Sequence, residues 1–274
     1  MSLRFRVLGS GSTGNATLVE GGGVRVLVDA GLGPRQLRDR LESAGIDPVS
    51  VDLVLLSHEH GDHARGAVPF VSKWGMPLAG TRGTWQAAGF GAETLPGYEC
   101  VAPEEPLRLG ELLIEAVPVP HDAAAPVAFV LSAGGISFGH ATDLGHVATS
   151  VVRAFEGCHA LLLESNYDPA MLRDGPYPWA LKERILGGFG HLSNGDVGRY
   201  LERGMGDLCR TVVLAHLSRK NNHPELALLA AEEALCRRGE SDVSFTVADA
   251  LGTGWITVRK REEPSRGVGQ MRLF

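Results

Sequence analysis

The stretch SHEHGDH, residues 57–63, places four side chains of the metal-ligand type within six residues: His58, His60, Asp62 and His63. Imidazole and carboxylate groups suit zinc, manganese and iron. Four ligands this close along the chain do not easily serve one tetrahedral ion, whereas they can serve two neighbouring ions. The stretch follows the apolar run 51–56, which predicts a buried strand. We therefore expect a metal site in a loop at a strand end.

Other ionisable residues also lie where predicted strands end. His121 comes just after LLIEAVPV, Asp143 ends ISFGHATD, and His216 stands within TVVLAHLS. Glu164 ends the apolar run ALLLE. Because buried parallel strands bring their ends to one edge of a sheet, we expect these side chains to converge on one site with residues 58–63.

The composition is typical of a soluble globular protein, with 44% hydrophobic and 21% charged residues in a chain of 274. A net charge of -6 argues against a surface built for nonspecific nucleic-acid binding, although it does not exclude a local basic groove. No apolar run approaches the roughly 20 residues of a membrane helix, and the N-terminus lacks a signal-peptide pattern. We therefore expect a cytoplasmic protein. The four cysteines form no C-x-x-C pair, which argues against a cysteine-ligated zinc site.

The order of predicted elements is mostly strands in the first half, then strands alternating with helices. Residues 3–8 and 16–20 alternate around a glycine-rich turn and predict a hairpin. The segment VRVLVD predicts a strand that ends on Asp29, and residues 34–45 predict a helix with Pro at its start and Gly at its end. The region VSKWGMPLAG, residues 71–80, is predicted to belong to the short strands of the middle section.

The motif SHEHGDH matches the H-x-H-x-D-H signature of the metallo-β-lactamase fold, which this chain resembles. The resemblance implies an α/β protein, a four-layer αββα sandwich with a dinuclear metal site at its edge. It also implies the ligands of two divalent ions: His58, His60 and His121 for one, Asp62, His63 and His216 for the other, and Asp143 as the bridge.

Further blocks narrow the resemblance to the YycJ/WalJ type of this superfamily, from residue 3 to about residue 249. They include GSGSTGNAT, ATDLGHV, LLLESNYD, GHLSN and LAHLSRKNNHPELA. This type implies a DNA exonuclease, related in site design to RNase Z and the β-CASP nucleases, with a role in DNA repair or replication-linked processing. A hydroxide bridging two ions, Mn or Zn, would attack phosphorus, because two cations lower its pKa and stabilise the transition-state charge.

Three further residues receive roles from this resemblance. His191 in GHLSN is the candidate proton donor to the leaving oxygen, and Glu164 fits the place of the acid that orients it. Asp29 matches the acid that braces the metal loop. Structural roles stay open for each: helix packing for His191, a strand-end salt bridge for Glu164 and a turn for Asp29. The predicted catalytic set is Asp62, Asp143, Glu164 and His191.

The glycine-rich turn is expected near the rim of the site. Ser10, Ser12 and Asn15 lie in it, and its backbone N–H groups could bind a phosphate, although turn formation explains the glycines equally well. His146 is a candidate for lining the substrate cleft. Four cations flank the site blocks and are candidate phosphate contacts or solvated surface charges: Lys182, Arg184, Arg219 and Lys220.

Two other kinds of function stay open. A thioester, lactone or β-lactam hydrolase of the same fold would use similar metals, because a fold does not fix a substrate. Asp143 argues against the β-lactamases, where another residue type commonly fills this place, and the GHLSN block favours nucleases. An RNA-processing nuclease is a further alternative, although no long tRNA-binding arm is visible. The last alternative is a non-catalytic DNA-repair adaptor, which the complete ligand set disfavours.

The end of the chain suggests a partner. We predict one hydrolase domain, residues 1–258, followed by a flexible tail, residues 259–274. The tail ends on QMRLF, in which Gln270, Leu273 and Phe274 resemble the Q-x-x-L-F pentapeptide that binds the bacterial sliding clamp. A Leu-Phe pair in an apolar pocket would carry the affinity. The alternative is a tail that folds back onto the core.

Overall fold

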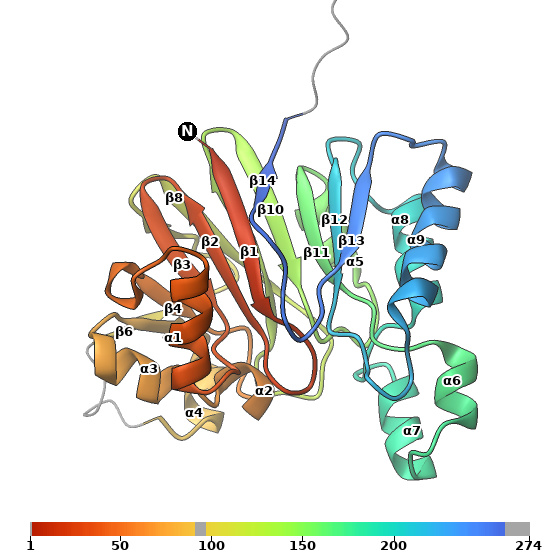
Figure 1. Ribbon diagram of the computed structural model, residues 1–274, viewed down its shortest axis with the longest axis horizontal. Helices are drawn as coiled ribbons and strands as arrows, with labels where there is room; N and C mark the ends of the chain where they lie inside the picture. The colour runs from red at the N-terminus through yellow and green to blue at the C-terminus, as the bar shows by residue number, and fades with distance from the viewer. Residues whose placement is uncertain (1, 91–96, 261–274) are drawn as a thin grey trace, which may run out of the picture.

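The computed structural model describes residues 2–90 and 97–260, and within them two seven-stranded sheets lie face to face between outer helices (Figure 1). In the first sheet the order is β14 (Ile256–Val258), β1 (Leu3–Gly9), β2 (Ala16–Gly21), β3 (Val24–Val28), β4 (Leu53–Leu55), β5 (Leu78–Gly80) and β6 (Tyr98–Cys100). In the second it is β13 (Ser244–Val247), β12 (Thr211–Ala215), β11 (Ala160–Glu164), β10 (Ile136–Ala141), β9 (Val127–Ala133), β8 (Leu112–Pro118) and β7 (Leu107–Leu109).

Helices cover the outer face of each sheet. On the first sheet they are α1 (Pro34–Ser43), α3 (Ala67–Trp74) and α4 (Arg82–Ala87), with the short η1 (Pro48–Ser50) and α2 (Gly61–Ala64) nearby. On the second sheet they are α5 (Thr149–Phe155), α8 (Asn194–Arg203) and α9 (Pro224–Arg238). The remaining pair, α6 (Pro169–Asp174) and α7 (Trp179–Leu186), extends past the strand ends on the side where α2 lies (Figure 1).

Three apolar layers hold these elements together. Between the sheets, the rings of Phe5 and Phe138 stack with centroids 4.0 Å apart. Separate clusters join the first sheet to α1 and α3, and the second sheet to α5, α8 and α9. The four-layer αββα sandwich predicted from the sequence is thereby confirmed.

Strand sequences follow from the number of faces that are covered. In β1, Leu3, Phe5 and Val7 point into the core, and the arginines between them are partly exposed. By contrast, β11 is buried at every residue, because the other sheet covers one face and helices cover the other. The strands β3 to β6 run parallel, as do β10 to β13. Their ends therefore meet at one rim of the sandwich.

One predicted element is wrong in part. Residues 71–74 of VSKWGMPLAG belong to α3, and only Leu78–Gly80 form a strand. Ala67, Phe70 and Val71 are buried at the spacing of one helix face, so the helical period begins before the quoted stretch. Gly75 then ends the helix in the left-handed conformation, with φ 84°.

The remaining predictions about the whole chain concern membrane helices, the domain boundary and the tail. No helix in the described parts of the chain is long and apolar enough to cross a membrane. The domain boundary at residue 258 stays a prediction, and residues 261–274, with the proposed pentapeptide, lie outside the described residues.

Candidate metal centre

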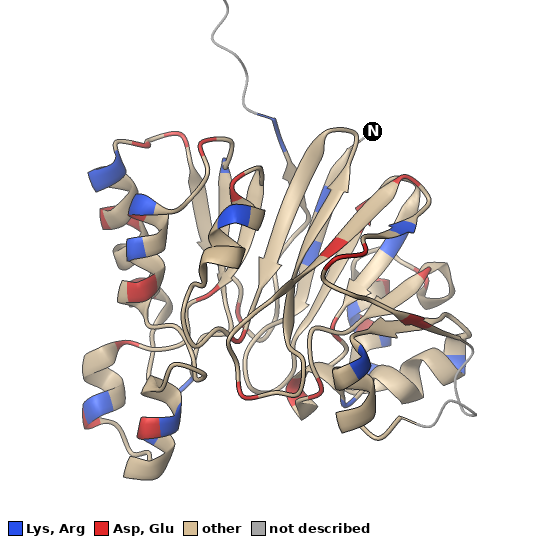
Figure 2. Cartoon of the chain, turned by 180° about the vertical axis from the view of Figure 1, so that it is seen from behind, with Lys and Arg blue, Asp and Glu red and all other residues tan. Residues whose placement is uncertain are grey.

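The candidate site lies at the rim where the strands of both sheets end. From the first sheet, Asp29 follows β3 and residues 58–63 follow β4. From the second sheet come the residues after β8, β10 and β12 and the last residue of β11: His121, Asp143, His216 and Glu164. Charged residues elsewhere lie mainly on the outer helices and loops, and most of the strand ribbon is uncharged (Figure 2). A buried cluster of histidines and acids is therefore unusual within this molecule.

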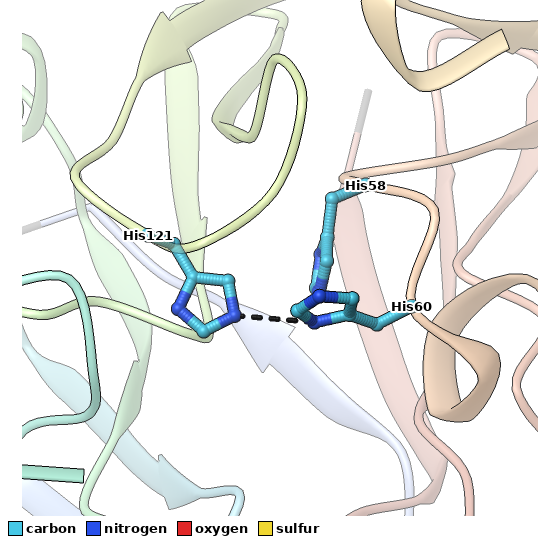
Figure 3. A group of neighbouring side chains, drawn as sticks. All are labelled: His58, His60 and His121. Carbon is cyan, nitrogen blue, oxygen red and sulfur yellow. Dashed lines mark hydrogen bonds between the residues drawn. The ribbon is translucent and has the colours of Figure 1, made fainter. Parts of the chain in front are cut away.

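The first ligand group consists of His58, His60 and His121, whose imidazoles point toward one another (Figure 3). One ligand atom from each lies within 4.8 Å of the others. His121 Nε2 is 3.3 Å from His60 Nδ1. His58 Nε2 is buried without a hydrogen-bond partner among the described residues. A cation at this point would satisfy that nitrogen.

The second group consists of Asp62, His63 and His216, again with ligand atoms within 4.8 Å of one another. His216 Nε2 is 3.4 Å from Asp62 Oδ2, and His63 Nε2 is 3.8 Å from the same oxygen. Asn15 Nδ2 lies 3.0 Å from His63 Nε2. The two groups together contain six of the seven predicted ligands.

Asp143, the seventh, lies between the groups. Its Oδ2 is 2.9 Å from His63 Nε2, and its Oδ1 is 3.8 Å from His121 Nε2. The carboxylate is buried, and Oδ2 has no hydrogen bond of good geometry within the described part of the chain. A buried carboxylate with such an oxygen, beside two sets of imidazoles, fits a bridge between divalent cations.

Four of the histidines are oriented by a partner on the nitrogen that faces away from the cluster. His63 Nδ1 donates to Asp29 Oδ2 at 2.7 Å, and His216 Nδ1 lies 3.0 Å from Glu164 Oε1. His121 Nδ1 donates to the carbonyl of Gly190 at 3.0 Å, and His58 Nδ1 lies 3.0 Å from Ser57 Oγ. With the proton on Nδ1, each Nε2 presents a lone pair to the cluster, as metal binding requires.

Asp29 also fixes the start of the metal loop. Its Oδ1 accepts the backbone N–H of Ser57 at 2.8 Å, and the Ser57 hydroxyl lies 2.9 Å from both carboxylate oxygens. The same carboxylate therefore holds His63 through its ring and the loop through Ser57. Sequence reasoning omitted Ser57, although it directly precedes His58 at the strand end.

The backbone at the site is strained. Among the described residues, three that are not glycine have positive φ: Asp29 at 61°, Asp143 at 60° and His216 at 55°. Each follows directly after a strand or one residue beyond it. A left-handed residue turns the chain sharply, so the side chain leaves the strand direction and points across the rim. Such strain is uncommon outside functional sites.

Burial and the nearby acids shift the pKa values of the histidines in opposite directions. Burial lowers the pKa of His58 well below its ordinary value. Burial also opposes a charge on His63, but the nearby carboxylates of Asp143 and Asp29 raise its pKa to about 10. Without a cation, His63 therefore holds a proton, which a bound metal ion would displace.

His191 and Glu164 form a pair beside the ligand groups. His191 Nδ1 lies 2.7 Å from Glu164 Oε1, and Glu164 Oε2 accepts the backbone N–H groups of Leu144 and Leu192. Burial lowers the pKa of His191, but the Glu164 charge and hydrogen bond outweigh it, and the pKa is raised. His191 Nε2 makes no hydrogen bond with the described residues, and the ring lines the open pocket.

A pocket of about 350 Å³ opens over this cluster, a volume within the usual range for small-molecule sites. Ser12, Asn166 and Ser218 line it with polar groups, and Tyr177 and Leu181 line it from the α6–α7 side. Ser10 and Asn15, in contrast, support ligands: Ser10 Oγ accepts the backbone N–H of His216, and Asn15 contacts His63.

The other candidate residues differ in whether they line the pocket, are buried or are exposed. His146 is not among the residues lining the pocket, and its Nδ1 donates to the carbonyl of Gly188. Lys182 is buried and donates to the carbonyl of Arg173 at 2.6 Å, so it is not a solvated surface charge, and its contact with DNA stays a prediction. Arg184 lines the pocket. Lys220 lies over the ring of Tyr177, with its Nζ 5.5 Å from the centroid, and Arg219 is exposed.

The chain matches a known domain family and is similar to two named exodeoxyribonucleases. Residues 24–217 match the Beta-lactamase superfamily domain. Exodeoxyribonuclease WalJ of Streptococcus pneumoniae serotype 2 is 34% identical over 231 residues, which cover 83% of this chain and 86% of the relative. Exodeoxyribonuclease YycJ of Bacillus anthracis is 33% identical over 241 residues, covering 87% and 91%.

Solved structures support the fold. The metallo-beta-lactamase fold protein YhfI from Bacillus subtilis aligns with a TM-score of 0.72 at 18% identity, covering 94% of this chain and 100% of its own. The short form of human tRNase Z aligns with a TM-score of 0.62 at 16% identity, covering 93% and 99%. At these identities the likeness concerns the fold alone.

Proposed function

The chain belongs to the beta-lactamase superfamily, in the family of the WalJ and YycJ exodeoxyribonucleases, and on this basis we propose that it is a metal-dependent exodeoxyribonuclease. One observation carries the proposal. Asp143 lies against both ligand groups and lines the open pocket. Two groups joined by one carboxylate suit phosphodiester hydrolysis, in which charge develops on several oxygens at once.

We infer that the cluster holds two divalent cations, zinc or manganese. His58, His60 and His121 would hold one, Asp62, His63 and His216 the other, and Asp143 would bridge them. Bound there, the cations would supply Lewis acidity, activating water and offsetting the charge that develops on the phosphate.

Residues of the chain supply the proton for the leaving oxygen, the contacts to the substrate and the support of the metal ligands. His191 donates a proton to the leaving oxygen from Nε2, while Glu164 holds Nδ1 and favours the protonated ring. Ser12, Asn166 and Ser218 offer hydrogen bonds to phosphate oxygens and sugar from the pocket wall. Asp29 holds His63 and the metal loop in place.

Metal analysis combined with a nuclease assay tests this function. The purified protein is assayed for bound metal and then for digestion of end-labelled double-stranded DNA, with and without added Mn²⁺. Stepwise shortening from an end is expected. A chromogenic β-lactam and a thioester, in parallel reactions, test the acyl-hydrolase alternative. A fully metal-loaded protein that shortens neither DNA strand would overturn the proposal.

We also propose a role in DNA repair or replication-linked processing, in which the tail binds a partner protein. We infer that Gln270, Leu273 and Phe274 bind a bacterial sliding clamp, which would raise the local concentration of the enzyme at DNA. The cytoplasmic location expected from the sequence accords with this role and stays a prediction. A fluorescent peptide covering residues 269–274, titrated with a clamp, is expected to bind, and Leu273→Ala or Phe274→Ala is expected to abolish binding. An intact peptide without detectable binding would remove the partner.

A further inference from the structure

The loop between α7 and His191 has the sequence GGFG, residues 187–190, and its backbone is fastened at three successive carbonyls. His146 Nδ1 donates to Gly188 at 3.1 Å, the Asp122 N–H donates to Phe189 at 3.1 Å, and His121 Nδ1 donates to Gly190 at 3.0 Å. Two of these donors come from the segment that carries a predicted metal ligand. The loop is therefore held directly against the site.

Close packing adds to these bonds. A Cβ placed on Gly145 would lie 2.1 Å from the carbonyl oxygen of Gly188 and 2.6 Å from Cα of Phe189. The two backbones thus touch with no room for a side chain at Gly145. Despite this fixed backbone, the Phe189 side chain is 64% exposed. Phe189 does not itself line the pocket, but the next residue, Gly190, does, so the exposed ring stands one residue from the site. An exposed aromatic ring next to a site that binds nucleic acid can stack on a base.

Arg184 is connected to Phe189 through Asp122, which contacts both residues. It lines the pocket, its side chain is 59% exposed, and its Nε donates to Asp122 Oδ2 at 2.6 Å. The terminal nitrogens of the guanidinium make no hydrogen bond with the described residues, so they are available to a ligand. Asp122 therefore contacts both residues: its carboxylate accepts from the Arg184 side chain, and its N–H donates to the backbone carbonyl of Phe189.

We propose that Arg184 and Phe189 form a nucleotide clamp in which Arg184 binds a backbone phosphate next to the scissile bond and Phe189 stacks on an unpaired base. A guanidinium matches a phosphate in a forked geometry, and an aromatic ring stacks on any base. A base inside a duplex has both faces covered by its neighbours, so Phe189 can engage only a terminal or frayed nucleotide. The clamp rests on the proposed nuclease function and extends it to a substrate class, strand ends that are single-stranded or readily frayed.

The test uses end-labelled oligonucleotides with the terminal bases present or replaced by abasic spacers. On normal ends, Phe189→Ala is expected to raise KM about tenfold with little change in kcat, and Phe189→Trp is expected to restore KM. On abasic ends, wild type and Phe189→Ala are expected to have the same KM. Arg184→Ala is expected to raise KM on both substrates and to reduce the salt dependence by about one phosphate contact.

Trp179 provides the matched control. It is an aromatic residue of α7 with 63% exposure, and its ring N–H donates to Glu183. Neither ring lines the pocket, but Phe189 adjoins Gly190, which does, whereas neither sequence neighbour of Trp179 does. Trp179→Ala is expected to leave both kinetic constants unchanged. DNA binding by the metal-loaded His191→Ala variant, which is expected to turn over slowly, is followed by fluorescence anisotropy, and adding Phe189→Ala is expected to weaken this binding on normal ends only.

The outcomes are distinct. If wild type shortens DNA but Phe189→Ala loses equal affinity for normal and abasic ends, or loses none, the clamp is wrong and the nuclease function stands. If metal-loaded wild type shortens no DNA, the proposed function fails, and the clamp fails with it.

Discussion

Glu164 joins two functions through one carboxylate. Its Oε1 lies 2.7 Å from His191 Nδ1 and 3.0 Å from His216 Nδ1, so it orients the proposed proton donor and a proposed metal ligand together. Its Oε2 accepts two backbone N–H groups, which keep the buried charge satisfied. The sequence suggested the link to His191, but the link to His216 required the folded strands β11 and β12 side by side.

Replacing Glu164 by Gln is expected to move the pH dependence of kcat. A His191 that donates a proton must be protonated, so activity falls as pH rises through its pKa. The carboxylate raises that pKa. Glu164→Gln removes this charge, and the fall in activity is therefore expected to begin at a lower pH. The measurement is kcat against pH at saturating DNA, with metal content determined alongside because Glu164 also contacts His216. An unmoved alkaline limb would contradict the assigned role.

His191→Ala separates proton donation from metal binding. His191 belongs to neither of the two proposed ligand groups, so its removal is expected to leave both metals bound. Turnover is expected to fall by about 10²- to 10⁴-fold, the usual contribution of a general acid. Metal analysis and kcat check this prediction, with Asp143→Ala as the control that should lose metal as well. Unchanged turnover would remove His191 from the mechanism.

Asp29 offers a test of the bonds behind the ligands. Asp29→Asn keeps the size of the side chain and tolerates the left-handed backbone at φ 61°. The neutral amide holds His63 Nδ1–H less strongly than a carboxylate does, so metal affinity is expected to fall by about 10- to 100-fold. A competitive chelator titration measures this change. Equal affinity in wild type and variant would assign Asp29 to the turn alone.

At the scale of elements, the sequence indicated which residues lie together because each predicted ligand is in a segment that follows a strand. The apolar runs before His58, Asp143 and His216 were readable as strands, and parallel strands share one rim. It did not disclose the left-handed backbone at Asp143 and His216, because Asp and His adopt that conformation more often than most residues but still only in a small minority of positions. Nor could local sequence place Asp122 beside Arg184, since that contact joins the loop after β8 to α7 across 62 positions.

The packing of Gly145 against residues 187–190 is an element-scale contact with a measurable role. Gly145→Ala is expected to push the loop away and to destabilise the protein by about 1–3 kcal/mol, as overpacking does. Gly188→Ala is the control, because an added Cβ there meets nothing within 4 Å. Thermal unfolding of both variants checks the prediction. Equal melting temperatures would show that the loop yields freely.

At the scale of the whole molecule, the proposed metals connect the two sheets. His58, His60, Asp62 and His63 come from the loop after β4 in the first sheet, whereas His121, Asp143 and His216 follow strands of the second. The Phe5 and Phe138 stack joins the sheets through the core, and the rim would join them through cations. The sequence implied this ligand set through its resemblance, but a division of ligands between sheets became visible only with the strand order.

Removing the metals is therefore expected to lower the stability of the whole domain. A cation that binds only the folded state at a thousand times its Kd contributes about 4 kcal/mol, which corresponds to a change in melting temperature on the order of 10 °C for a domain of this size. In its absence the clustered imidazoles and carboxylates lose their shared partner. Calorimetry of the loaded protein with and without EDTA measures the change. The double variant His58→Ala/His216→Ala, which lacks one ligand from each group, is expected to show the same melting temperature with and without EDTA. A metal-loaded wild type that melts at the same temperature in both conditions would contradict a metal link between the sheets.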